Sequence, residues 1–420
     1  MILLKNGTFI DWQTLEFKQT DVLVGEGENG KLQFTFDKAT TKNAKIIDCS
    51  GKFITKSFAC GHHHVYSALA RGMGAPKKSP ENFLEILQYV WWTLDKALNL
   101  ETIRYSALTT AIACAKNGVT FAIDHHASPF AVAGSLETIA KAFDEVGVGH
   151  LLCYEISDRD GMEIAQKGLA ESSNYLSERQ GLVGLHASFT VGGETLKQAV
   201  ALAGQKRSGI HIHVAEDEYD QVHCLTHYSK RIIERMEEAG ALEFSKTILG
   251  HCLHLNKNEK NIIAGSPAWI VQNTESNLNN QVGNFNSAGL GKNIMMGTDG
   301  MHSDMLRSAK AAFFSGHNYD KIDYAETYRR FRNVHDYLDT NEFMGDGENN
   351  LVVMDYDTPT PLTASNFLGH FLFGIESKHV QHVISNGKLI VENRNIITVN
   401  EAEILTESKK QAARLWKKMK

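Results

Sequence analysis

The sequence contains no C-x-x-C pair, no long basic run and no apolar run of membrane-spanning length. Its six scattered cysteines favour reduced thiols over a disulfide framework, as is usual in the cytoplasm. The formal net charge of −6 disfavours nucleic-acid binding. The opening stretch MILLKNGTFIDW lacks the cleavage site of a signal peptide. We therefore expect a soluble cytoplasmic protein with no nucleic-acid or membrane partner.

The spacing of apolar residues changes twice along the chain. Residues 1–55, and again the residues after about Gly345, carry short apolar runs separated by Asn-Gly and glycine-rich turns, which is typical of β structure. Between them, eight strand-like runs alternate with segments of helical periodicity. The predicted strands are Ile54–His62, Val119–His126, Gly149–Ile156, Leu182–Ala187, Ile210–Ala215, Thr247–Cys252, Ala268–Gln272 and Asn293–Gly297.

This alternation predicts an α/β fold, a (β/α)8 TIM barrel. An open doubly wound sheet is the alternative, but no G-x-G-x-x-G motif follows a strand to support it. The predicted helices include Glu81–Ala97, Thr102–Lys116 and Asp217–Ala239. We expect a barrel domain over residues 56–344. Residues 1–55 and 345–420 are expected to form a small β-sandwich, with an amphipathic terminal helix at Glu401–Lys418.

Histidine is abundant, with 19 residues, and its clusters fall at the predicted strand ends where barrel enzymes carry their functional groups. Because strand side chains alternate, His62 and His64 share one face and His63 points away. A His-x-His pair at a strand end can chelate a metal. His213 and Asp299 can complete a shell suited to Zn²⁺ or another divalent ion. One strand-end histidine alone is more often a hydrogen-bonded residue, but six strand ends carrying His or Asp favour a metal site.

Four stretches resemble the ordered signatures of the amidohydrolase superfamily, in the branch of cytosine deaminase and the atrazine and melamine hydrolases. They are GHHHVYSALARG (61–72), HIHVAEDEYD (211–220), LGHCLHL (249–255) and MGTDGMHSDM (296–305). The resemblance extends over nearly the whole chain. Further stretches are similar to the SsnA-type aminohydrolases: NFLEILQYVWWTLDKAL (82–98), GVTFAIDHHASP (118–129), GLHASFTVGG (184–193) and TESNLNNQVG (274–283).

The resemblance implies a role for each matching residue. It makes His62, His64, His213 and Asp299 the metal ligands. Glu216 becomes the proton shuttle, with Asp299 accepting a proton from the water. His251 would hold the water or the substrate, and His186 would line the pocket. Strand four offers His186 where binuclear relatives carry a bridging lysine, which implies one divalent metal per subunit, Zn before Fe or Mn.

The implied activity is that of a metal-dependent aminohydrolase, a deaminase that hydrolyses a C–N bond of an amino-substituted nitrogen heterocycle. Alternatives on the same scaffold are a cyclic-amide or imidazolone ring hydrolase and a chlorohydrolase. A non-catalytic metal-binding scaffold is a further alternative, against which the complete residue set argues. The implied partners are a small heterocyclic substrate and a second copy of the chain in a homodimer.

Several residues leave alternatives open. Arg71 and His302 are candidate substrate contacts, although Arg71 can equally pin a loop. Trp91 and Trp92 can stack on a planar heterocycle, but their long predicted helix favours packing or a subunit interface. Only one of the adjacent His125 and His126 can face the barrel mouth, and the pattern does not choose between them. Cys252 lacks a separate base and is expected to be a core thiol.

Overall fold

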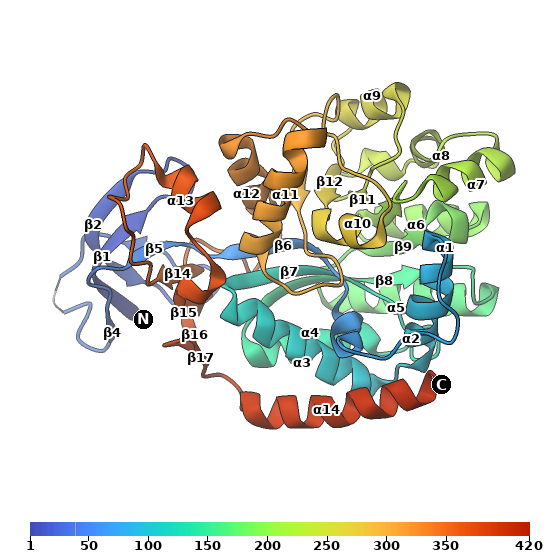
Figure 1. The fold of residues 1–420 in the computed structure, drawn as a ribbon. Coiled ribbons are helices and arrows are strands. Elements are labelled where there is room, and N and C mark those ends of the chain that lie inside the picture. Colours follow the sequence, from blue (N-terminus) through green and yellow to red (C-terminus); the bar gives the residue numbers. More distant parts are fainter. Residues whose placement is uncertain (38) are drawn as a thin grey trace.

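The computed structural model describes residues 1–37 and 39–420. At its centre, eight parallel strands form a barrel in the order β13-β12-β11-β10-β9-β8-β7-β6 (Figure 1). A parallel bridge between His63 and Asp299 joins the first strand to the segment after the last. The predicted (β/α)8 barrel is therefore confirmed. The strands are β6 (Phe58–His63), β7 (Val119–His126), β8 (Gly149–Ile156), β9 (Val183–Ala187), β10 (Ile210–Val214), β11 (Ile248–His251), β12 (Trp269–Gln272) and β13 (Ile294–Met296).

Helices surround this barrel and bury apolar faces against it (Figure 1). They begin where capping side chains satisfy free backbone amides. For example, Asn99 and Thr102 form a reciprocal capping box at the start of α3. Within the described residues the helices are α1 (Phe83–Ile86), α2 (Trp92–Ala97), α3 (Leu100–Lys116), α4 (Ser135–Val146), α5 (Met162–Glu178), α6 (Gly193–Gln205), α7 (Glu218–Tyr228), α8 (Ile232–Glu238), α9 (Lys257–Gly265), α10 (Thr274–Asn280), α11 (Met305–Tyr319), α12 (Tyr324–Thr340), α13 (Phe367–Phe373) and α14 (Glu401–Lys418).

Two predicted helices are interrupted. The prediction of one helix over Asp217–Ala239 is wrong, because Ser229 adopts a left-handed φ of 55° that ends α7 before α8 begins. The Glu81–Ala97 segment contains a π-helical turn, Leu87–Trp91, between α1 and α2. Such turns are frequent at functional sites, and this one carries aromatic side chains into the cavity described below.

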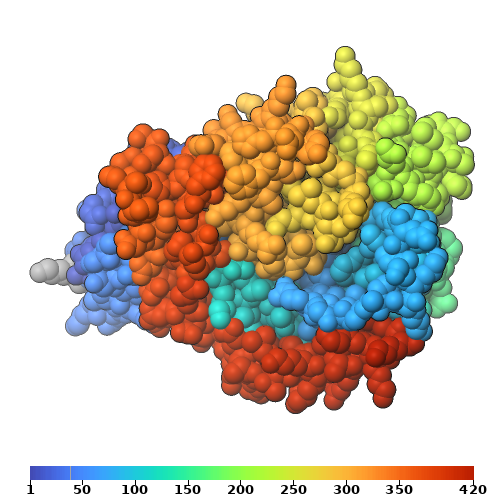
Figure 2. Space-filling view, viewed as in Figure 1, coloured from blue at the N-terminus to red at the C-terminus, as the bar shows by residue number. Residues whose placement is uncertain are grey.

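The two ends of the chain meet in a separate nine-stranded sheet, which lies at the left of Figure 1. β14 pairs antiparallel with β5, so the red and blue segments lie side by side there (Figure 2). Ile54, Leu351 and Ile384 belong to the apolar cluster of this sheet. Its strands are β1 (Ile2–Ile10), β2 (Phe17–Val24), β3 (Leu32–Gln33), β4 (Lys45–Asp48), β5 (Phe53–Lys56), β14 (Leu351–Met354), β15 (Val380–Ser385), β16 (Lys388–Glu392) and β17 (Asn395–Ile396).

The predicted strand Ile54–His62 is divided between the two sheets. β5 belongs to the terminal sheet and β6 to the barrel, with Ser57 between them. The expected domain limits at residues 55/56 and 344/345 stay predictions. Among the described residues, no helix combines the length and the apolar character needed to cross a bilayer.

Candidate metal centre and active-site cavity

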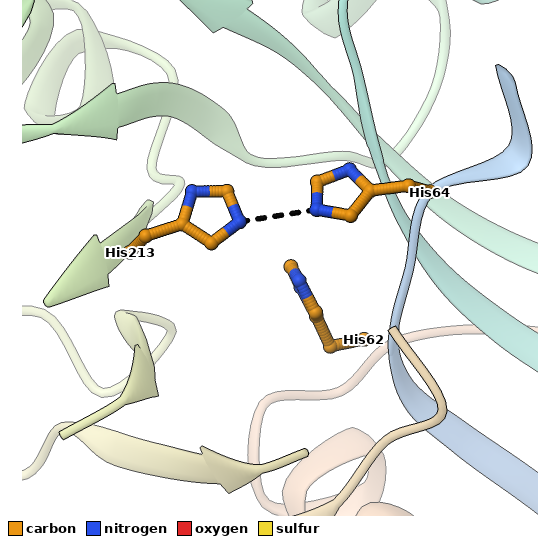
Figure 3. Close-up of side chains that lie close together, drawn as sticks. All are labelled: His62, His64 and His213. Atoms are coloured by element: carbon orange, nitrogen blue, oxygen red, sulfur yellow. Dashed lines mark hydrogen bonds between the residues drawn. The ribbon is translucent and has the colours of Figure 1, made fainter. Parts of the chain in front are cut away.

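Four side chains converge at the carboxyl end of the barrel strands. The rings of His62 in β6, His64 directly after β6 and His213 in β10 point toward one another (Figure 3). The His64 and His213 Nε2 atoms lie 3.1 Å apart, and Asp299 Oδ1 lies 3.3 Å from His64 Nε2 and 3.7 Å from His62 Nε2. Ligands about 2.0–2.1 Å from a tetrahedral Zn²⁺ lie about 3.3 Å from each other. The spacing of these atoms therefore fits a shell around one ion.

The hydrogen bonds of the imidazoles also point to a cation. Nδ1 of His64 donates to the carbonyl of His125 at 2.6 Å, and Nδ1 of His213 donates to the carbonyl of His186 at 2.7 Å. Burial lowers the pKa of both rings, so each is neutral and its Nε2 carries a lone pair. Two facing lone pairs repel. His62 Nε2 is also buried without a hydrogen-bond partner. A divalent ion satisfies all three nitrogens.

The backbone is strained where these groups leave their strands. Ala215, His251 and Asp299 adopt left-handed φ angles of 47°, 66° and 54°. Residues other than glycine rarely adopt such angles, which cost about 1–3 kcal/mol and cluster at functional sites. Ala215 directly follows β10 and precedes Glu216, His251 is the last residue of β11, and Asp299 lies shortly after β13. The strain therefore lies where the fold aims the candidate catalytic groups.

Glu216 and His251 lie beside the convergent nitrogens. Burial raises the pKa of Glu216 to about 7, against the opposing effect of His251. The Glu216 Oε2 atom lies 3.5 Å from His251 Nε2, which lies 3.8 Å from Asp299 Oδ2. His251 Nδ1 donates to Asn277 Oδ1 at 2.7 Å, while its Nε2 is buried without a partner. Glu216 can therefore carry a proton near neutral pH, next to a buried imidazole nitrogen whose hydrogen-bonding position is free.

A cavity of about 80 Å³ opens above these groups. One wall is apolar and comes from the segment with the π-helical turn: Phe83, Leu87, Trp91 and Trp92. Both tryptophans are therefore cavity residues, in contrast to the packing role that the sequence favoured. The polar residues that line the cavity are His64, Tyr66, Ser67, Glu155, His186, His213, Glu216, Ser276, Asn279, Asn280 and Asp299.

The three predicted substrate contacts differ in position. His186 lines the cavity, with its Nδ1 2.6 Å from Thr190 Oγ1. Arg71 is outside the cavity lining and donates to the carbonyl of Met301 at 3.2 Å, which fits the loop-pinning alternative. His302 is also outside the lining, because its Nε2 bonds Glu275 Oε2 at 2.6 Å.

The neighbouring histidines follow the strand alternation. His63 turns away from the convergent nitrogens, and its Nε2 lies 2.8 Å from Ser303 Oγ. His125 faces the barrel interior, where its ring lies 4.7 Å from that of His213. His126 instead bonds Ser128 Oγ at 2.9 Å. Cys252 is buried, and burial raises the pKa of its thiol, as expected for a core residue.

Sequence reasoning missed three residues of this region. Glu155 lies near the end of β8 and lines the cavity; its signal was an acidic residue in a mostly apolar strand. His211 shares a strand face with His213, and its Nε2 lies 2.9 Å from His62 Nδ1. Asn277 orients His251, but no pattern in its polar segment marks it.

Comparison with known proteins agrees with this geometry. The profile of the amidohydrolase family matches residues 53–331. The chain belongs to the amidohydrolase family. It is therefore a hydrolase that acts on carbon–nitrogen bonds.

Similar proteins cover most of this amidohydrolase. A 5-methylthioadenosine/S-adenosylhomocysteine deaminase of Syntrophomonas wolfei is 25% identical over 395 residues, covering 88% of each chain. A 5'-deoxyadenosine deaminase of Methanopyrus kandleri is 28% identical over 347 residues, covering 77% of this chain and 78% of its own. The crystal structure of an adenosine deaminase from Xanthomonas campestris with bound zinc has a TM-score of 0.81 at 18% identity, and covers 99% of this chain and 98% of its own.

Proposed function

We propose that this amidohydrolase is a metal-dependent deaminase of an amino-substituted nitrogen heterocycle. The observation that carries the proposal is the convergence of His62, His64, His213 and Asp299 next to a cavity that Glu216 also lines. Relatives named as deaminases of adenine nucleosides support the reaction type.

We assign one divalent ion, zinc, to the convergent nitrogens and Asp299. Three imidazoles and one carboxylate suit Zn²⁺, with Fe and Mn as alternatives. When bound, the metal lowers the pKa of a water from 15.7 to about 7, which provides a nucleophile at neutral pH.

The protein side chains then move the protons. Asp299 accepts a proton as the water oxygen bonds to the ring carbon. Glu216 supplies a proton to the leaving nitrogen, since its pKa of about 7 allows both protonation states. In its protonated form, His251 donates from Nε2 to the oxygen that develops negative charge. The C–N bond breaks and the amine leaves as ammonia, so that water is added across the bond.

Ammonia release by the zinc-loaded protein tests this proposal. The panel contains aminopurines, aminopyrimidines and the adenine nucleosides that the relatives' names give. We expect stoichiometric ammonia with retention of the aromatic ring absorbance. Ring opening without ammonia would favour the cyclic-amide alternative, and release of chloride from chlorinated triazines alone would favour a chlorohydrolase. No ammonia, ring-opened product or chloride from any compound of the panel would favour the non-catalytic metal-binding scaffold, whereas full activity in Glu216→Ala would exclude Glu216 as the proton donor.

Other assignments rest on composition and resemblance. We propose a cytoplasmic homodimer with a small-molecule substrate and no nucleic-acid or membrane partner. The SsnA-type branch is the finer assignment that we propose within the family. Size-exclusion chromatography with light scattering tests the dimer, for which a single species of one-chain mass is the contradicting result.

A further inference from the structure

The cavity contains a second carboxylate, Glu155, that the proposed proton transfers do not use. It lies at the end of β8 and is only 6% exposed. Its nearest basic atoms are His125 Nδ1 at 3.4 Å and Arg159 Nη2 at 3.9 Å. Both distances exceed those of a charge-assisted hydrogen bond, which are about 2.7–2.9 Å. A buried carboxylate with such distant partners can accept further donors from the cavity.

Arg159 stands behind this carboxylate and helps to keep it anionic. The guanidinium bonds Asp95, lies 3.1 Å from Asp160 Oδ2 and stacks over the Trp92 ring at 5.0 Å. The Arg159 Nη2 atom lies 3.9 Å from Glu155 Oε1, and a fixed positive charge at this distance favours the anionic form of the carboxylate. The position of Arg159 thus fixes a charged acceptor in the cavity wall, beside an aromatic face.

Glu155 and Glu216 face opposite sides of the metal centre. Glu155 lies toward β7, against His125 Nδ1, whereas Glu216 lies toward β11, against His251 Nε2. Candidate ligand atoms of His64 and His213 lie within 4.8 Å of a Glu155 oxygen. A planar ring with its reacting carbon at the metal therefore meets a proton-carrying carboxyl on one edge and an anionic acceptor on the other.

We propose, on the basis of the deaminase function above, that Glu155 determines specificity by accepting a ring N–H adjacent to the amino-bearing carbon. The substrate class is the 2-amino-4-oxo type of ring, as in guanine or isocytosine. Such a ring offers N–H on one side of the reacting carbon and a nitrogen lone pair on the other, which matches the two carboxyl groups. Adenine-type rings offer only lone pairs near that carbon, and an anionic acceptor repels them.

Paired compounds test this assignment on the zinc-loaded full chain. Isocytosine is compared with 2-aminopyrimidine, and guanine with 2-aminopurine, because the second member of each pair lacks the ring N–H. Calorimetric dissociation constants and kcat/KM for ammonia release are both measured. We expect the wild type to prefer the N–H member by about 10- to 100-fold, the range for one hydrogen bond to a charged group.

Glu155→Gln should reduce this preference to a few-fold, mainly through KM and the dissociation constant, while Glu155→Asp should keep more of it. Glu145→Gln removes the same charge at a surface ion pair with Arg104 and should leave the preference unchanged. Thermal unfolding and zinc content establish that each variant is folded and loaded.

An unchanged preference in Glu155→Gln would overturn the proposal, and so would a wild-type preference for the compounds without N–H. The predicted binding preference without ammonia release would contradict the deaminase function and support the role of Glu155. Ammonia release from adenine-type compounds alone would support the function and contradict that role.

Discussion

The two ends of the barrel differ in whether their buried polar groups have hydrogen-bond partners. At the amino-terminal end of β6, Lys56 Nζ donates to Asp346 Oδ1 and to the carbonyls of Asp346 and Gly347, at 2.7–3.0 Å. His335 bonds Asp346 Oδ2 and the carbonyl of Ser57. At the carboxyl end, the Nε2 atoms of His62 and His251 are buried without partners.

This contrast distinguishes the buried groups that stabilise the fold from those that bind a ligand. A buried network in which every group is hydrogen-bonded stabilises the fold. Removal of one partner destabilises it, because a buried charge is then left without its counter-ion. Unpartnered buried nitrogens cost free energy unless a ligand satisfies them. The amino-terminal network is therefore expected to govern stability, and the carboxyl-terminal cluster to govern metal binding and catalysis.

The largest effect is expected for Glu216→Gln. Loss of a general acid–base group should lower kcat/KM by about 10²- to 10⁴-fold, with the free energy of unfolding nearly unchanged. Ammonia assays and urea unfolding measure both quantities. Glu218→Gln, an exposed change two residues away, serves as the control and should be active. Near-wild-type activity in Glu216→Gln would remove it from the mechanism.

Asp346→Asn should have the opposite profile. It leaves the Lys56 ammonium buried without its counter-ion, so the free energy of unfolding should fall by about 3–5 kcal/mol. The kcat/KM of the folded fraction should stay within about threefold of the wild type, because Asp346 does not line the cavity. The exposed Asp339→Asn is the control. Equal stability of both variants would contradict the structural role of the network.

Acid should weaken the same network. His335 and Lys56 overcome the effect of burial and lower the pKa of Asp346 to about 2, from an ordinary 3.8. The folded state therefore releases this proton more readily than the unfolded state. The stabilisation is fully present above about pH 4 and is lost as pH falls toward 2, a change of about 2 kcal/mol. Urea unfolding between pH 5 and 2.5 should show this slope, and Asp346→Asn should lack it.

The smallest effect is expected for Arg71→Ala. Its guanidinium bonds a carbonyl at the cavity rim and stays outside the lining. We expect KM to change by less than about threefold and the free energy of unfolding by about 0.5 kcal/mol. Steady-state kinetics with the best substrate measure this. A tenfold rise in KM would show that Arg71 contacts the substrate after all.

The barrel could be predicted from the sequence because its signals are local. Strand alternation placed His62 and His64 on one face, and each strand end carried its functional residue in chain order. The division of Asp217–Ala239 was not predictable in the same way, because the break depends on the single left-handed residue Ser229. The apolar periodicity continues across that residue.

The cavity wall was predicted least well, since it depends on contacts between distant segments. The π-helical turn brings Trp91 and Trp92 to the cavity, and an ideal helix pattern does not reveal this turn. Arg71 and His302 follow the signature motifs, yet Met301 and Glu275 hold them elsewhere. In the sequence, Glu155 is an acidic residue in a mostly apolar strand. Only the structure shows that it lies near Arg159 and His125.

Metal analysis of the purified protein tests the central claim most directly. If the facing nitrogens of His64 and His213 are ligands, the wild type should hold close to one divalent ion per chain by mass spectrometry. His213→Ala should lose that ion and the activity, while His63→Ala should keep the ion. Wild-type protein that deaminates without bound metal, or His213→Ala protein that retains the ion, would contradict the account.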